Sequence, residues 1–198
     1  MCVKAKSDSN SQQSSVAVAH DLSILQWVSR SVVLVNGISG SGKTTLAAPL
    51  GRELRMPVVG KDMVKEALAD ILPGSLPTRA LGALASDVMW SLAGLIDGPV
   101  ILESIWVAGR HERFLETGLK NLGADKVVEV WCTVPLDLAY ERFITRPRHP
   151  IHDDGNRLDE WWAVSRDASP CPGYPIIDVR TDVPVDIAAV AERVRALL

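Results

Sequence analysis

The sequence carries GISGSGKT at residues 37–44, between an apolar run at residues 31–36 and a second apolar run at residues 45–50. This octapeptide fits the pattern G-x-x-x-x-G-K-[ST], in which a glycine-rich backbone cradles phosphate groups. The pattern is informative here because the run before it is typical of a buried strand and the run after it of a helix. We therefore predict a phosphate-binding loop (P-loop) and a nucleoside triphosphate ligand.

The residue types in this loop suit the chemistry of phosphate binding. Glycines allow successive N–H groups to turn inward, and the helix N-terminus adds a favourable dipole. Lys43 is expected to bridge the β- and γ-phosphates of ATP, and the Thr44 hydroxyl to bind Mg²⁺. A turn that binds nothing is the alternative, but it would have no need of Lys-Thr after the last glycine. The expected nucleotide-binding residues here are Gly37, Ser39, Gly40, Ser41, Gly42, Lys43, Thr44 and Thr45.

Composition and charge narrow the class of protein. The chain has 198 residues, 47% hydrophobic and 23% charged, which predicts one soluble domain. Its net charge of -3 gives no general attraction to nucleic acid, so we expect no nucleic-acid partner. No apolar run approaches the roughly 18 residues of a membrane helix, and the N-terminus lacks the pattern of a secretory signal. Three scattered cysteines, Cys2, Cys132 and Cys171, favour free thiols and a cytoplasmic protein.

Apolar runs and turn signals divide the chain into a tail and one domain. Residues 1–20 are rich in Ser, Gln and Asn and predict a flexible tail, with a short helical turn at 22–27. Residues 21–198 predict alternating strands and helices, hence an α/β fold with a five-stranded parallel sheet covered on both faces, a three-layer sandwich. The expected strands are 31–36, 57–59, 100–102, 127–132 and 176–179, and the expected helices are 43–54, 62–72, 78–96, 110–121, 136–145, 159–166 and one closing helix capped by Asp186.

Periodicity also predicts which helix faces are buried. In the helix at 62–72 the apolar face comprises Met63, Ala67, Leu68 and Ile71. In the helix at 78–96 the expected stripe comprises Leu81, Leu84, Ala85, Val88, Leu92 and Leu95, and in the closing helix it comprises Ile187, Val190, Val194 and Leu197.

Two carboxylates follow the ends of predicted strands. Asp62 comes three residues after the second strand, and Glu103 follows the third directly. Ligands of parallel α/β sheets gather at these strand ends. Asp62 is the candidate to orient or deprotonate an acceptor hydroxyl, or else a helix cap. Glu103 is the candidate to bind Mg²⁺ through water or to bind substrate, or else a solvated charge.

Further candidates follow Glu103 in the same loop. Trp106 could wall an acceptor pocket, and Arg110 could bind an anion on the acceptor. Ordinary packing and surface exposure remain the alternatives for both residues.

The strongest charge cluster of the chain lies at residues 142–152. Arg142 and Arg146 are four residues apart and share a helix face, and Pro147 then ends that helix. We call residues 146–159 the lid, because an arginine carried by a closing segment stabilises the charge of a transferring phosphoryl group. Arg146 and Arg148 are the candidates for that role. A solvated surface paired with neighbouring acids is the alternative.

Three motifs resemble those of one family: residues 37–45, the GKDMVKE segment at 60–66, and the lid with its RHP-x-H core. The chain resembles P-loop small-molecule kinases of the chloramphenicol phosphotransferase and zeta-toxin type, within a group often labelled AAA-family ATPases. The resemblance implies a kinase-type P-loop NTPase fold and a base at Asp62. It also implies that one or more of Arg142, Arg146 and Arg148 contact the phosphates of ATP. The acid at Glu103 departs from the Walker B pattern of motor ATPases, so an ATPase assignment would mislead.

The sequence therefore predicts an ATP- and Mg²⁺-dependent kinase that transfers the γ-phosphate to a hydroxyl of a small molecule. The acceptor alternatives are an antibiotic or a sugar-like metabolite, with a nucleotide sugar as a weaker option. A nucleoside or nucleotide kinase is a second interpretation, and a nucleotide-binding regulatory protein without transfer is a third. We expect a monomer or a homodimer.

Overall fold

A computed structural model of the chain describes residues 30–72 and 76–198. The predicted tail at 1–20 and the predicted helical turn at 22–27 lie outside the described residues. Among the residues described, no helix is both long enough and apolar enough to cross a lipid bilayer.

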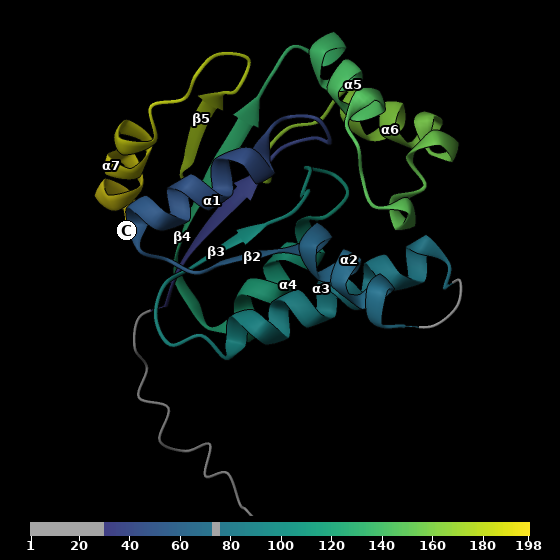
Figure 1. Cartoon of the computed structure of the whole chain (residues 1–198). Coiled ribbons are helices and arrows are strands. Elements are labelled where there is room, and N and C mark those ends of the chain that lie inside the picture. The colour runs from purple at the N-terminus through teal and green to yellow at the C-terminus, as the bar shows by residue number, and fades with distance from the viewer. Residues whose placement is uncertain (1–29, 73–75) are drawn as a thin grey trace, which may run out of the picture.

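A five-stranded sheet, parallel throughout, forms the centre of the domain (Figure 1). The strands lie in the order β2-β3-β1-β4-β5, which puts β1 in the middle. Their bounds are β1 (Arg30–Asn36), β2 (Val58–Gly60), β3 (Val100–Glu103), β4 (Ala124–Thr133) and β5 (Ile176–Arg180). Near-continuous apolar runs suit strands that are covered on both faces. The predicted five strands and their parallel arrangement are confirmed.

Helices cover both faces of this sheet. On one face α1 (Lys43–Leu54) and α7 (Ile187–Leu197) share a core with the sheet that includes Leu50 and Val194. On the other face lie α2 (Lys61–Ile71), α3 (Thr78–Gly94) and α4 (Glu112–Leu122), whose core includes Met89 and Leu115. The α/β three-layer sandwich is therefore confirmed. Asp186 caps α7 as expected, because its Oδ1 accepts a hydrogen bond from the Ala189 N–H.

A third, smaller cluster lies beyond the ends toward which the strand arrows point (Figure 1). It joins α5 (Leu136–Thr145) to α6 (Leu158–Ser165) around Phe143 and Trp161. The lid runs between these helices and contains two short 3₁₀ turns, η2 (Pro150–His152) and η3 (Asp154–Asn156). The lid thus starts and ends on packed helices at the same edge of the sheet as the P-loop.

All three predicted helix faces are wrong in part. Leu84, Leu92 and Leu95 of the stripe predicted for α3 are exposed, whereas Leu81 and Ala85 are buried as predicted and Met89 and Ala93 are buried beside them. This helix is apolar nearly all round, so its sequence does not select a face, and the packing of β3 and α4 decides. In α2, Met63, Ala67 and Ile71 of the predicted face are exposed. Val64 and Lys65 are buried, because the lid and α3 cover the face that carries Lys65. Leu197 of α7 is also exposed.

Candidate active site

The P-loop bends sharply between β1 and α1. Gly40 has φ 90° and Gly42 has φ 81°, a region that side-chain-bearing residues rarely adopt. A Cβ on Gly40 would lie 2.1 Å from the carbonyl oxygen of Ala139 in α5. Gly40 therefore lets the loop pass close under α5.

Lys43, Thr44 and Glu103 come together at the start of α1. Lys43 Nζ lies 3.8 Å from Glu103 Oε1, and Thr44 Oγ1 donates a hydrogen bond to the same oxygen at 3.3 Å. Glu103 is 4% exposed, and burial raises the pKa of its carboxyl although Lys43 opposes the rise. The parallel register explains the contact, since Glu103 is aligned with Val35 of β1, just before the P-loop. A hydroxyl and a carboxylate in contact form a donor set that fits Mg²⁺.

A buried polar network supports the loop from below. Asn36 Oδ1 accepts from the backbone N–H groups of Gly37 at 2.7 Å and Trp106 at 2.9 Å. Its Nδ2 donates to the Trp106 carbonyl and, at 2.7 Å, to Glu129 Oε1. Asn36 and Glu129 are both fully buried, and burial raises the pKa of Glu129 to about 7. Sequence reasoning missed this network, although an acid inside the apolar run at 127–132 was a signal that could have found it.

Asp62 lies in the first turn of α2 and is held by the lid. Its Oδ2 accepts from Arg148 Nη2 at 2.6 Å, and Arg148 Nη1 donates to both carboxylate oxygens of Asp154 at 2.9 and 2.8 Å. Burial raises the pKa of Asp62, but Lys43, Arg148, His152 and Lys61 together outweigh it and hold this pKa below its usual range. Gly60, not Asp62, is the N-cap of α2. Asp62 is thus an ionised carboxylate near Lys43, and the helix-cap alternative is wrong.

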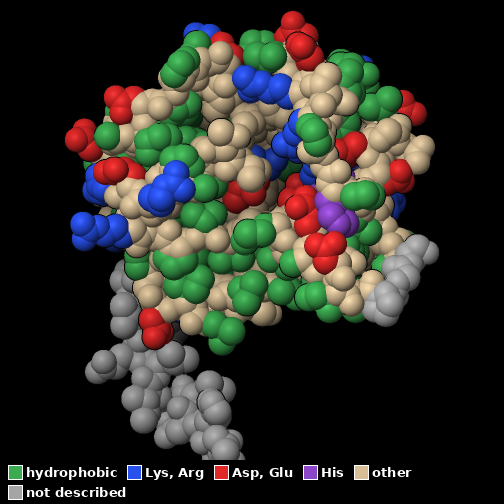
Figure 2. Space-filling model, viewed as in Figure 1, with side chains coloured by type: hydrophobic (Ala, Val, Ile, Leu, Met, Phe, Trp, Pro, Cys, Tyr) green, Lys and Arg blue, Asp and Glu red, His purple; other side chains and the backbone are tan. Residues whose placement is uncertain are grey.

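Further contacts attach the lid to α2 and α3. His152 Nε2 lies 2.6 Å from Glu66 Oε1, and His149 Nε2 lies 3.1 Å from Asp70 Oδ1. Thr78 Oγ1 donates to the Ile151 carbonyl at 2.5 Å. Figure 2 shows histidine beside acidic side chains on this face of the molecule. The lid therefore lies against α2 and the N-terminal end of α3.

The two remaining arginines of the cluster differ in their partners. Arg142 Nη2 donates to the carbonyl of Thr181 at 3.2 Å, and Thr181 Oγ1 in turn donates to the Ser41 carbonyl of the P-loop at 2.5 Å. Arg146 has a buried Nε without a partner among the described residues. Burial and Arg148 lower the pKa of Arg146, while Asp62, Asp154 and Glu103 oppose the fall. Arg146 thus has a free donor within electrostatic reach of both predicted acids.

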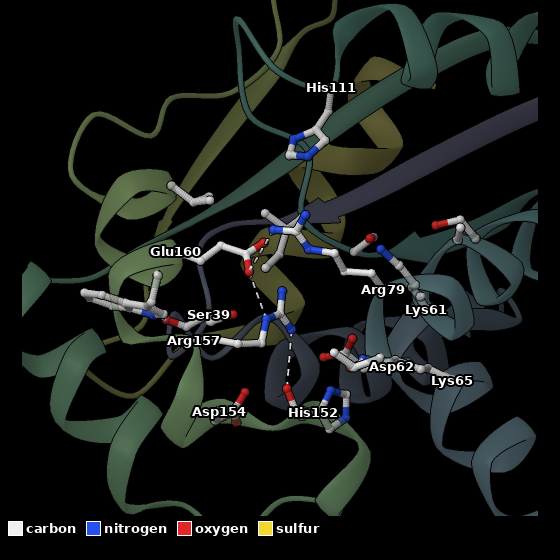
Figure 3. A pocket seen from close by; sticks show the side chains of 18 of the residues that line it. Ser39, Lys61, Asp62, Lys65, Arg79, His111, His152, Asp154, Arg157 and Glu160 are labelled. Carbon is white, nitrogen blue, oxygen red and sulfur yellow. Dashed lines mark hydrogen bonds and ion pairs between the residues drawn. The ribbon is translucent and has the colours of Figure 1, made fainter. Parts of the chain in front are cut away.

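A cavity of about 430 Å³ opens beside Asp62 (Figure 3). Trp106 and Trp161 contribute aromatic walls, and Ser39 of the P-loop lies on its edge. Trp106 is almost fully buried. It lines the cavity and also packs in the core below it. Arg110 is exposed and does not line this cavity. The volume is that of a typical small-molecule site.

The structure gathers most predicted site residues into two groups near the carboxyl ends of the strands, a donor end and an acceptor end. The P-loop residues, with Lys43 and Thr44, meet Glu103 at one end. Asp62, Arg148 and Trp106 lie around the cavity at the other end. Residues that sequence reasoning did not single out as cavity-lining include Lys65, Arg79, His111, Arg157 and Glu160.

Several solved structures share this fold. A protein from Chloroflexus aurantiacus J-10-fl, named as a presumed kinase, is 27% identical with a TM-score of 0.76, over 86% of this chain and 99% of that one. A sugar kinase from Janibacter sp. HTCC2649 is 22% identical with a TM-score of 0.54, over 85% and 94%. The APS kinase of Mycobacterium tuberculosis, in complex with AMPPNP and APS, is 21% identical with a TM-score of 0.54, over 85% and 96%.

These likenesses confirm the kinase-type P-loop NTPase fold. No protein-family model matches the chain, and no curated protein sequence matches it significantly. The structural neighbours include kinases of small molecules. The narrower resemblance to the chloramphenicol phosphotransferase and zeta-toxin group stays a prediction.

Proposed function

We propose that the protein is an ATP- and Mg²⁺-dependent kinase that transfers the γ-phosphoryl group to a hydroxyl of a small molecule. One observation carries the proposal: an ionised acid, Asp62, faces a cavity of about 430 Å³ at the sheet edge that also presents Lys43 and Thr44. A nucleotide-binding protein without transfer has no need of a base and a cavity at this place. The fold shared with solved kinases adds support.

The donor end would hold the phosphates of ATP. The amides of the P-loop and the Lys43 ammonium bind the β- and γ-phosphates. Thr44 and Glu103, in contact at 3.3 Å, would hold Mg²⁺, which when bound neutralises charge on those phosphates. Arg146, with its free Nε, would donate to the γ-phosphate oxygens as they gain charge.

The acceptor end would activate the hydroxyl. Asp62 accepts the hydroxyl proton while the oxygen forms its bond to the γ-phosphorus and the bond from that phosphorus to the bridging oxygen of ADP breaks. Asp62 must first exchange its contact with Arg148, and the released guanidinium would turn to the transferring group. Arg148 thereby neutralises Asp62 before substrate binds and the phosphoryl group afterwards.

The test is transfer of label from γ-labelled ATP to a panel of hydroxylated metabolites, antibiotics and nucleosides. Lys43→Ala should abolish transfer, with a loss of about three orders of magnitude. Asp62→Asn should lower kcat about 10² to 10⁴-fold while the affinity for ATP stays nearly the same. Asp97→Asn, at an exposed position between α3 and β3, is the matched control and should remain active.

The outcomes separate the candidate functions. Normal turnover of the Asp62→Asn protein would remove Asp62 from the base role. Tight ATP binding without transfer to any acceptor would favour the regulatory protein. Selective transfer to nucleosides would favour a nucleoside kinase.

A further inference from the structure

Two lysines of α2 face the cavity without a carboxylate partner. Lys61 and Lys65 both line it, and neither forms an ion pair with any residue in the ranges 30–72 and 76–198. Lys65 is 4% exposed, and its Nζ donates one hydrogen bond, to Thr78 Oγ1 at 2.6 Å. An ammonium has three protons, so two of those on Lys65 have no hydrogen-bond partner among the described residues.

The surroundings of these lysines are short of negative charge. The cavity is lined by five basic side chains, Lys61, Lys65, Arg79, Arg148 and Arg157, and by four acids, Asp62, Asp87, Asp154 and Glu160. Arg148 already holds Asp62 and Asp154, and Arg157 Nε donates to Glu160 at 3.0 Å. Asp87 is exposed to solvent. The lining therefore has a small excess of positive charge, and neither lysine has a carboxylate oxygen within ion-pair distance among the described residues.

The pKa values of both lysines are lowered in the folded protein. Burial lowers the pKa of Lys61, and Arg157 and Lys43 lower it further against the opposite effect of Asp62. Burial and Arg157 likewise lower the pKa of Lys65, against the opposite effect of Asp62. Burial disfavours an ammonium that has no carboxylate within ion-pair distance. An anion between the lysines would offset that effect.

The spacing of the two lysines suits a single anion. Positions 61 and 65 are four apart on α2 and therefore neighbours on one face. Figure 3 shows the side chains of Lys61, Arg79 and Arg157 pointing toward the same space from different elements. A group with two or three oxygens can bridge donors arranged in this way.

We infer that the acceptor carries, besides its hydroxyl, an anionic group, a carboxylate, phosphate or sulfate, that Lys61 and Lys65 bind. This inference rests on the proposed function, because it places the acceptor in the same cavity. Lys61, Asp62 and Lys65 lie within little more than one turn of α2, so the hydroxyl and the anionic group of the acceptor would be close to each other. The aromatic walls at Trp106 and Trp161 would hold the carbon frame between them.

The first test measures anion binding without any knowledge of the acceptor. The full chain is saturated with AMPPNP and Mg²⁺ so that the P-loop is filled, and phosphate, sulfate and acetate are titrated at constant ionic strength. We expect a saturable rise in the unfolding midpoint and a matching binding isotherm. Lys61→Gln and Lys65→Gln should each weaken anion binding at least about tenfold, and Lys65→Arg should restore it.

The controls keep this test falsifiable. Lys120→Gln removes an exposed lysine of α4 and should bind anions like the wild type. Lys61 is only half-buried, so the Lys61→Gln protein should fold even where Lys65→Gln does not, as circular dichroism will report. Absence of saturable anion binding in the wild type, or undiminished binding in the Lys61→Gln protein, would overturn the inference.

A second test distinguishes the inference from the kinase assignment. Matched acceptor pairs, D-gluconate with D-glucose and glycerol 3-phosphate with glycerol, are compared in the transfer assay. Preference for the anionic member, with KM for that acceptor but not for ATP raised by Lys61→Gln, supports the inference. Equal transfer to the neutral members overturns it and leaves a kinase. Lysine-dependent anion binding without transfer to any acceptor supports the inference and counts against the kinase.

Discussion

The donor end and the acceptor end of the site are built in different ways. At the donor end, the P-loop is one continuous stretch, and Glu103 of β3, Trp161 of α6 and Thr181 after β5 each contact it. At the acceptor end, α2, α3 and the lid each contribute charged side chains, and the ion pair between Arg148 and Asp62 spans 86 residues of sequence. The comparison teaches that a local motif can define a phosphate site, whereas an acceptor site depends on segments that meet only after folding.

The largest effect is expected at Arg146, which feels the charges of both Asp62 and Glu103. Arg146→Ala should lower kcat about 10³-fold or more, because its buried Nε is free to donate to the transferring group. Acceptor affinity should change little. Arg52→Ala, on the exposed surface of α1, is the control. Steady-state kinetics would decide, and full activity of the Arg146→Ala protein would make the arginine an ordinary surface charge.

Asn36 connects the donor end to the acceptor end through Gly37 and Trp106. Asn36→Ala leaves Glu129 and three backbone groups without this partner. The free energy of unfolding should fall by about 3 kcal/mol, and KM should rise for ATP and for the acceptor together. Urea denaturation and kinetics measure the two effects. A rise in only one KM would show that the two ends are independent.

Glu129 accepts a hydrogen bond from Asn36 in this network. Its buried carboxyl should make the free energy of unfolding depend on pH. Its carboxyl has a pKa of about 7 in the folded protein against 4.5 ordinarily. Because the folded-state pKa is raised, the neutral form favours folding, and this stability is present below pH 4.5 and lost as pH rises toward 7. The loss is roughly 2–3 kcal/mol.

Glu129→Gln keeps an oxygen for Asn36 and cannot ionise. Its free energy of unfolding should therefore lack the decline that the wild type shows between pH 4.5 and 7. Glu192→Gln, exposed on α7, should retain that decline. Chemical denaturation across this pH range makes the comparison, and parallel curves for wild type and Glu129→Gln would exclude Glu129 as the origin.

The smallest effects are expected from two glycine substitutions, one at the donor end and one at the acceptor end. Gly40→Ala places a methyl against the Ala139 carbonyl at a positive φ and should cost about 2 kcal/mol or more, with loss of nucleotide binding. Gly82→Ala, in α3 at the acceptor cavity, meets nothing within 4 Å. It should stabilise the protein by about 0.5–1 kcal/mol. Calorimetry would contradict this prediction if the free energy of unfolding changed equally in the Gly40→Ala and Gly82→Ala proteins.

Sequence reasoning predicted the fold well where the pattern was local. The structure has the strands, the P-loop and the Asp186 cap where they were expected. Each of these features depends on residues that are neighbours in the chain. The exposed Leu84, Leu92 and Leu95 show where periodicity failed, since α3 offers more than one apolar face. Arg110 stands outside the cavity because its loop turns it to solvent.

The sequence by itself determined the donor site. Its glycines, lysine and threonine act through backbone geometry and hydrogen bonds between residues that are adjacent in the chain. Only the tertiary structure decided the acceptor site, where Arg148 meets Asp62, Lys65 meets Thr78, and Asn36 meets Trp106. The physical reason is that these polar contacts are long-range and form only where the sheet, the α2–α3 pair and the lid exclude water together.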